Sequence, residues 1–259
     1  MMNRRVLLFS RNAGLLVLIG MSALAGAANY DIPKVTGIIV DGALDDWGAA
    51  GLAVEVLTDK QGRSELPGDF DPRFRLSWDE TGLALALTVV DDLLWEQPDP
   101  AALWDGDSFE WFILSGADAG ALLHVAVSPG LADGQPELRS NVYGFRQMPY
   151  GRAVALELAR VLTETGYQLE ARVPWSALEA PPAPGGEIGV QLYLNDADHP
   201  PARFQATWFP QTRTHEHADH VHRLRLAEQA SSAIRQRTQH GFDAFGRAAI
   251  DVTAIAEWS

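Results

Sequence analysis

Short stretches in which apolar and polar residues alternate are the dominant pattern of this chain. Phe74, Leu76 and Trp78 alternate with polar neighbours, the polar run Asp79-Glu80-Thr81-Gly82 follows, and a second alternating run extends from 83 to 89. A period of two places apolar side chains on one face of a strand, and a glycine-containing turn between two such runs indicates a β-hairpin. The pattern therefore predicts a hairpin over residues 73–89.

Similar strand-length runs, separated by Gly, Pro and Asp, continue through most of the chain. This arrangement predicts an all-β fold, an antiparallel β-sandwich of jelly-roll type, in one domain over residues 32–226. Further strands are expected at 38–40, 53–57, 108–114, 122–127, 153–162, 167–173, 188–195, 204–208 and 222–226.

The two ends of the chain have a different character. Residues 227–239 are rich in Ala, Gln and Arg and predict a short C-terminal helix in the segment 227–259. A tail or a partner-binding segment is the alternative. At the other end, Arg4, Arg5 and Arg11 flank a short apolar run, and Ala25-Gly26-Ala27 is a suitable cleavage site. We therefore expect a signal peptide over residues 1–27, a periplasmic or secreted protein, and no membrane span after cleavage.

The composition excludes several classes of function. The chain has 34 acidic and 20 basic side chains, a net charge of −14, and most of the excess falls in residues 31–118. Such a protein repels nucleic acid and anionic membranes, so neither is expected as a partner. Because there is no cysteine, disulfides, zinc–thiolate sites and thiol catalysis are excluded.

Residues 104–112 carry the most informative chemistry. Trp104 is followed by Asp105-Gly106-Asp107, and a strand pattern then places Phe109, Trp111 and Ile113 on one face and Glu110 on the other. Aromatic rings stack on the C–H faces of sugars, and carboxylates bind sugar hydroxyls. The stretch predicts a carbohydrate site at Trp104 and Glu110, unless Trp104 only packs its loop onto the sandwich.

Acidic residues gather at the predicted turns. Asp41-Gly42, Asp45-Asp46, Asp91-Asp92 and Asp105-Gly106-Asp107 are examples. Calcium needs six to eight oxygen ligands, so converging acidic turns are suited to bind it. Ordinary turn aspartates, which bond to nearby backbone N–H groups, have the same pattern.

Five motifs in this order resemble carbohydrate-binding module family 9, over roughly residues 32–226. They are IVDGALDDW at 39–47, LSWDETGL at 76–83 with Val90-Asp91-Asp92, WDGDSFE at 104–110, GYQLEARVPW at 166–175, and IGVQLYLNDA at 188–197.

This resemblance implies a calcium-containing sandwich that holds the end of a sugar chain between two tryptophans. Trp104 matches the first tryptophan and Glu110 the carboxylate, while the family's arginine position falls on His124. The family's strand with a glutamine and an asparagine matches Gln191, Tyr193 and Asn195. Asp91, Asp107 and Asp196 are the calcium ligands that the resemblance suggests.

The chain departs from the family in one place. The second tryptophan is expected in the loop after Trp208, but residues 209–217 contain none. His215 or His217 is the candidate to line the sugar slot there. Four histidines between 215 and 222 also suggest a transition-metal site if the segment is extended, with His215 beside His217 and His220 beside His222.

The favoured interpretation is a non-catalytic module that binds an oligo- or polysaccharide. Its expected partner is a separate glycoside hydrolase that degrades the polysaccharide. Catalysis would need Glu110 and Glu170 to act as a carboxylate pair, and no serine nucleophile motif is present. Two alternatives remain open. One is a haem-binding electron-transfer sandwich with Met148 and His124 as axial ligands, and the other is an interaction domain without sugar binding.

Overall fold

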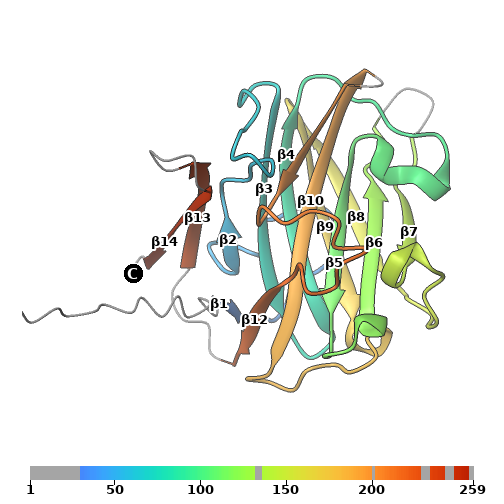
Figure 1. Ribbon diagram of the computed structural model, residues 1–259, viewed down its shortest axis with the longest axis vertical. Helices are drawn as coiled ribbons and strands as arrows, with labels where there is room; N and C mark the ends of the chain where they lie inside the picture. The colour runs from blue at the N-terminus through green and yellow to red at the C-terminus, as the bar shows by residue number, and fades with distance from the viewer. Residues whose placement is uncertain (1–29, 132–135, 200–201, 229–233, 243–247, 257–259) are drawn as a thin grey trace, which may run out of the picture.

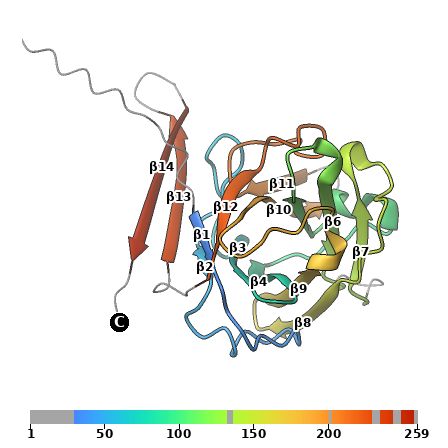
Figure 2. The same ribbon diagram turned by 90° about the horizontal axis from the view of Figure 1, so that it is seen from below.

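Two β-sheets pack face to face in the computed structural model (Figures 1 and 2), which describes residues 30–131, 136–199, 202–228, 234–242 and 248–256. The predicted signal peptide lies outside the described residues. The first sheet has the strand order β1 (Tyr30–Pro33), β12 (His222–Ala227), β10 (Glu187–His199), β5 (Ser108–Leu114), β6 (Leu122–Ser128) and β7 (Arg139–Tyr143), with β11 (Ala202–Thr207) also paired to β10.

The second sheet has the order β14 (Ala248–Ala256), β13 (Ile234–Phe242), β2 (Leu52–Val54), β3 (Phe70–Trp78), β4 (Gly82–Asp91), β9 (Gly166–Pro174) and β8 (Glu157–Thr163). All strand pairs are antiparallel except β1 with β12 and β13 with β2. The predicted all-β sandwich is confirmed, and the predicted hairpin is the β3–β4 pair.

Helical structure in the described residues is limited to four short 3₁₀ segments, η1 (Pro100–Asp105), η2 (Ala119–Ala121), η3 (Phe145–Gln147) and η4 (Trp175–Ala177). No helix among these residues is long and apolar enough to cross a membrane.

The core lies between the sheets and follows the predicted alternation. Phe109, Trp111 and Ile113 of β5 are in the main apolar cluster, while Phe112 belongs to a separate cluster on the outer face of the first sheet. Trp78 and Trp111 are buried, as expected, and the less buried Trp175 packs against the core.

Residues 35–50 cover the outer face of the second sheet. Trp47 is buried there against Ala84 and Ala86, and its Nε1 atom donates to Glu170 Oε1 at 2.7 Å. The backbone N–H groups of Asp41 and Gly42 donate to the other oxygen of Glu170. The strand predicted at 38–40 is therefore wrong, because this segment is held by side chains of the sheet face and not by an edge strand.

The predicted C-terminal helix over 227–239 is also wrong. Residues 234–239 belong to β13, which forms an antiparallel hairpin with β14 and pairs with β2 through Arg235 and Gln236. In β14, Ile250, Val252 and Ile255 are β-branched, and such residues favour extended backbone. The hairpin is visible at one edge of the molecule (Figure 2).

Candidate functional site

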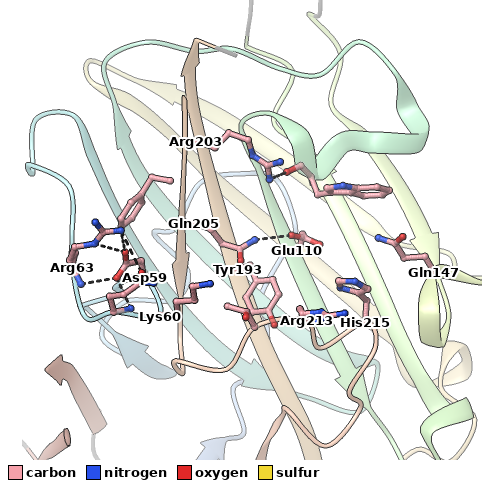
Figure 3. Close-up of a pocket in the computed structure, with 14 residues that line it drawn as sticks. Asp59, Lys60, Arg63, Glu110, Gln147, Tyr193, Arg203, Gln205, Arg213 and His215 are labelled. Carbon is pink, nitrogen blue, oxygen red and sulfur yellow. Dashed lines mark hydrogen bonds and ion pairs between the residues drawn. The ribbon is translucent and has the colours of Figure 1, made fainter. Parts of the chain in front are cut away.

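A cavity of about 660 Å³ opens on the outer face of the first sheet. Its floor includes Glu110 of β5, Tyr193 of β10 and Gln205 of β11. Lys60 and Arg63 lie on one side of this floor, and Gln147 and His215 lie on the other (Figure 3). Strands of one sheet and several loops distant in sequence therefore build a single concave site.

Trp104 lines the cavity from η1. Asp99 caps η1 by accepting a bond from Ala101 N, and Pro100 begins it, as its fixed φ favours. The ring of Trp104 packs edge-on against Tyr143 at 5.5 Å between centroids, and its carbonyl oxygen accepts a bond from Arg203 Nη2 at 2.6 Å. Trp104 thus packs its loop and also lines the cavity, so the two interpretations of this residue are compatible.

Glu110 is the centre of a buried hydrogen-bond network. Its Oε2 atom lies 2.8 Å from His124 Nε2, and Asn195 Nδ2 donates to Oε1 at 3.1 Å. Gln205 Nε2 donates to Asn195 Oδ1 at 2.8 Å and reaches Glu110 Oε1 at 3.5 Å. Phe112 stacks on the His124 ring at 4.2 Å between centroids. The carboxylate is therefore fixed in orientation at the cavity floor.

Gln191 and Tyr193 hold the loop that follows β11. Gln191 is wholly buried, and its Nε2 atom donates to the carbonyls of Phe209 and Gln211. The Tyr193 hydroxyl also donates to Gln211 O, at 3.0 Å, and accepts a bond from Thr214 N. Burial raises the pKa of Tyr193 well above its usual value. These contacts attach residues 209–214 to the sheet.

His215 lies in this loop and lines the same cavity as Trp104. Its carbonyl oxygen accepts a bond from Arg146 N at 2.6 Å, which ties the loop to η3. Burial lowers the pKa of the His215 side chain. Arg146, Gln147 and Arg213 have φ values of 56°, 56° and 62°, and they are the only non-glycine residues with positive φ in the described part of the chain. Such strain concentrates at binding sites.

Trp104, Glu110, Tyr193 and His215 thus meet at the cavity, as the sequence suggested. His124, Gln191 and Asn195 lie behind its wall with at most 2% of their surface exposed, and they support the lining residues.

Sequence reasoning missed the cavity residues outside the motifs: Lys60, Arg63, Gln147, Arg203, Gln205 and Arg213. Of these, Arg203 and Gln205 had a signal, since Arg203, Gln205 and Thr207 alternate with apolar residues in β11. The loop with Lys60 reaches the site through a backbone bridge between Thr58 and Thr207, which no local pattern announces.

Asp91, Asp107 and Asp196 converge as the resemblance implied. One carboxylate oxygen of each lies within 4.8 Å of the others, and all three are buried. Burial and the neighbouring carboxylates raise the pKa of Asp91 and of Asp196 to about 7, and that of Asp107 to about 9.

These carboxylates fit a calcium ion. Asp196 Oδ1 is buried without a hydrogen-bond partner, which is costly unless a cation or a proton satisfies it. A second group, Asp69, Asp92 and Asp198, also has carboxylate oxygens within 4.8 Å of one another, and its charges contribute to the raised pKa of Asp91. Calcium takes oxygen ligands of this kind from several loops.

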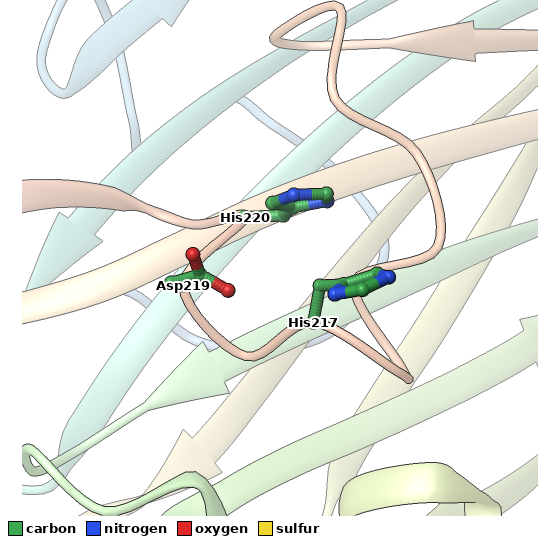
Figure 4. Close-up of side chains that lie close together, drawn as sticks. All are labelled: His217, Asp219 and His220. Atoms are coloured by element: carbon green, nitrogen blue, oxygen red, sulfur yellow. The ribbon is translucent and has the colours of Figure 1, made fainter.

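The histidine-rich segment is not extended, so the predicted pairing of its histidines is wrong. Residues 213–220 form turns, and the rings of His217 and His220 stack at 4.8 Å with Asp219 close by (Figure 4). His220 Nδ1 is 2.8 Å from Thr212 O. His222 is instead partly buried and packs against Trp208 and Phe209, and this burial lowers its pKa to about 4.

The geometry gives little support to haem binding or to glycoside hydrolysis. His124 Nε2 is bonded to Glu110 and its ring is covered by Phe112, so ligation would break that network. Glu110 and Glu170 lie on different sheets, on the outer face of each, with the core between them. They therefore cannot flank one glycosidic bond.

Comparison with known proteins gives one family and a consistent fold. The profile described as "Carbohydrate family 9 binding domain-like" matches residues 40–227. A family 9 carbohydrate-binding module from Caldicellulosiruptor kristjanssonii, solved in complex with cellotriose, has 18% identity and a TM-score of 0.61, covering 78% of this chain and 95% of its own. A structure of a family 9 module from the same organism with glucose has 19% identity and a TM-score of 0.55, covering 77% and 96%. No curated protein sequence matches the chain.

Proposed function

The chain belongs to the carbohydrate family 9 binding domain-like family, and on this premise we propose that it is a non-catalytic module that binds a carbohydrate in the cavity beside Trp104. The observation that carries the proposal is the presence of Trp104 and the fixed Glu110 carboxylate in one cavity. Sugar recognition needs both an aromatic face for the ring and fixed polar groups for the hydroxyls.

The dimensions of the cavity suit a small saccharide. Its volume of about 660 Å³ is within the range of roughly 300–1,000 Å³ that is typical of ligand pockets. Gln205 and Glu110 supply an amide donor and carboxylate acceptors that the Asn195 bonds already orient. Because these groups need no reordering, a bound hydroxyl loses little affinity to side-chain entropy.

The loop after Trp208, where the family has a second tryptophan, lines the cavity with other side chains. In this chain the loop after Trp208 contributes Arg213 and His215 to the cavity. An imidazole offers a smaller face than an indole, so less apolar surface is buried against the sugar. We therefore propose weaker, more polar binding than a clamp of two tryptophans would give.

Calcium supports the site in this proposal. Asp91 ends β4 in the second sheet, Asp196 lies in β10 of the first sheet, and Asp107 immediately precedes β5 of the first sheet, so an ion held by all three joins the sheets. Asp107 also lies two residues after η1 and accepts bonds from Trp95 N at 2.5 Å and Ala197 N at 2.8 Å. A bound ion neutralises these carboxylates and holds η1, which carries Trp104, in place.

Export, and cooperation with a separate glycoside hydrolase, complete the proposal. The N-terminal sequence supports export, since its arginines, apolar run and small residues have the order of a signal peptide. A module without a carboxylate pair of its own contributes affinity for a polysaccharide that a separate enzyme then cleaves.

Isothermal titration calorimetry of residues 28–259 in calcium tests the function. Glucose, cellotriose and xylotriose serve as probes, and saturable binding of at least one saccharide is expected. If no saccharide binds the folded protein at millimolar concentration, the chain has kept the fold as an interaction domain and the proposal is wrong.

A further inference from the structure

The cavity gathers positive charge in a chain that is otherwise strongly acidic. The whole chain has 34 acidic and 20 basic side chains, for a net charge of −14. Around the cavity the balance is reversed, because its lining contains four cations and only two acids, Asp59 and Glu110. The cations are Lys60, Arg63, Arg203 and Arg213. They come from the loop after β2, from β11 and from the loop after β11, so the reversal does not arise from one basic run.

The two acids are already bonded within the protein. Glu110 accepts from Asn195 and is bonded to His124, as described above. Asp59 accepts from Arg63 Nε at 2.7 Å and from the backbone N–H groups of Gln61 and Arg63. Arg203 is also compensated, because it pairs with Asp105 just outside the lining. The lining acids therefore leave two cations, Lys60 and Arg213, without a carboxylate partner inside the cavity.

Two of the cations, Lys60 and Arg213, are exposed and keep donors that can reach a ligand. The side chain of Lys60 is exposed and makes no hydrogen bond or ion pair in the described part of the chain. Arg213 has one ion pair, with Glu216, and 65% of its side chain is exposed. Its backbone is held at a φ of 62°, a conformation that costs free energy in a non-glycine residue. Lys60 and Arg203 flank the floor of the site (Figure 3).

We propose that the carbohydrate bound in this cavity carries a carboxylate, as a uronic acid does. This inference rests on the proposed function and names the class of sugar. A carboxylate forms charge-assisted bonds with Lys60 and Arg213, which are about twice as strong as neutral ones. A neutral sugar would partly desolvate the same cations without replacing the lost hydration. The acidic sugar is therefore the better ligand.

Calorimetry with matched sugars tests the inference. Cellotriose is compared with cellotriose oxidised to the carboxylate at C6, and glucose is compared with glucuronate and with glucose 6-sulfate, all in calcium. We expect the carboxylate form to bind at least about tenfold more tightly than the neutral form at low salt, and the preference to shrink at high salt because added ions screen exposed charges.

Lys60→Gln should reduce the ratio of acidic to neutral affinity by about threefold or more. Lys34→Gln is the matched control, because Lys34 pairs with Glu80 and does not line the cavity; its ratio should equal that of the wild type. Equal binding of neutral and acidic sugars would overturn the inference and leave the proposed function in place. Tighter binding of the sulfate would overturn the assignment of a carboxylate, and the absence of all binding would overturn both proposals.

Discussion

Glu110 and His124 form a buried pair on neighbouring strands of the first sheet, with 2.8 Å between Oε2 and Nε2. The His124 ring is wholly buried and stacks on Phe112, so the imidazole cannot turn away from the carboxylate. Asn195 holds the other oxygen of Glu110 from the opposite strand. The carboxylate that faces the cavity is therefore oriented by His124 and Asn195, which do not themselves line the cavity.

Replacing His124 with Phe should destabilise the protein and weaken sugar binding together. The substitution keeps an aromatic ring but leaves Glu110 Oε2 without its partner, which costs about 1–3 kcal/mol in a buried site. In a domain of this size, the melting temperature should fall by roughly 3–10 °C. Differential scanning calorimetry measures this, with His217→Phe in the exposed turn as the control. Equal melting temperatures for the two variants would show that the pair has no structural role.

Trp104→Ala should strongly weaken carbohydrate binding and leave the fold intact. The indole is half-buried and contacts Tyr143 only at its edge, so its loss removes the stacking surface with a modest loss of stability. Calorimetric titration should show at least about a tenfold weaker affinity. Leu162→Ala is the control, because Leu162 is an exposed apolar residue on β8 of the other sheet. Unchanged affinity in Trp104→Ala would place the sugar elsewhere.

Removing calcium should make the protein's stability depend on pH in a defined direction. The pKa values of Asp91 and Asp196 are raised to about 7 and that of Asp107 to about 9, all above the value of about 4 for an unfolded aspartate. Between pH 4 and these values the folded protein binds more protons than the unfolded chain, so its stability falls as the pH rises.

Thermal melts in chelator from pH 5 to pH 8 should therefore show a decreasing melting temperature. Excess calcium should remove this decrease, because the ion replaces the protons and binds more tightly as the carboxylates ionise. Asp107→Asn should lose the response to calcium, while Asp45→Asn, in an exposed turn, should keep it. Identical melts with chelator and with calcium at pH 8 would mean that no folding-linked ion binds.

Tyr193→Phe should loosen the loop over residues 211–217. The hydroxyl bonds to Gln211 O and Thr214 N; the phenylalanine variant leaves Thr214 N unpaired and Gln211 O with only its bond from Gln191. We expect faster hydrogen exchange in this loop and weaker sugar binding, since the loop carries Arg213 and His215 to the cavity. Tyr150→Phe is the control. It loses a comparable bond, to Ala177 O, at a position distant in sequence from residues 211–217, so it should not change hydrogen exchange in this loop. Equal exchange in the two variants would show that other contacts hold the loop.

The sequence predicted those parts of the molecule in which a local pattern determines the structure. Strand β5 was predicted with its correct ends, because Phe109, Trp111 and Ile113 alternate cleanly with the residues that face outward. The segment 38–40 was mispredicted because contacts with Glu170 and Arg172, more than a hundred residues away, determine its path.

The candidate site was predicted only in part for the same reason. Trp104, Glu110 and the three aspartates proposed to bind calcium belong to motifs that resemble the family, whereas the loop with Lys60 and Arg63 reaches the cavity through a single backbone bridge from Thr58 to Thr207 of β11. At the C-terminus, composition favoured a helix over 227–239, but pairing with β2 decided for a strand.

The bridge between Thr58 and Thr207 has a consequence for how the binding preference of this protein can evolve. Thr207 N donates to Thr58 O at 2.8 Å, and beyond this point residues 59–63 form a turn closed by bonds to Asp59. The turn therefore supplies one wall of the cavity without contributing to any strand. Substitutions, insertions or exchanges within it would change the lining of the cavity without removing any strand pairing, so this part of the cavity wall is separable from the part of the chain that forms the sandwich.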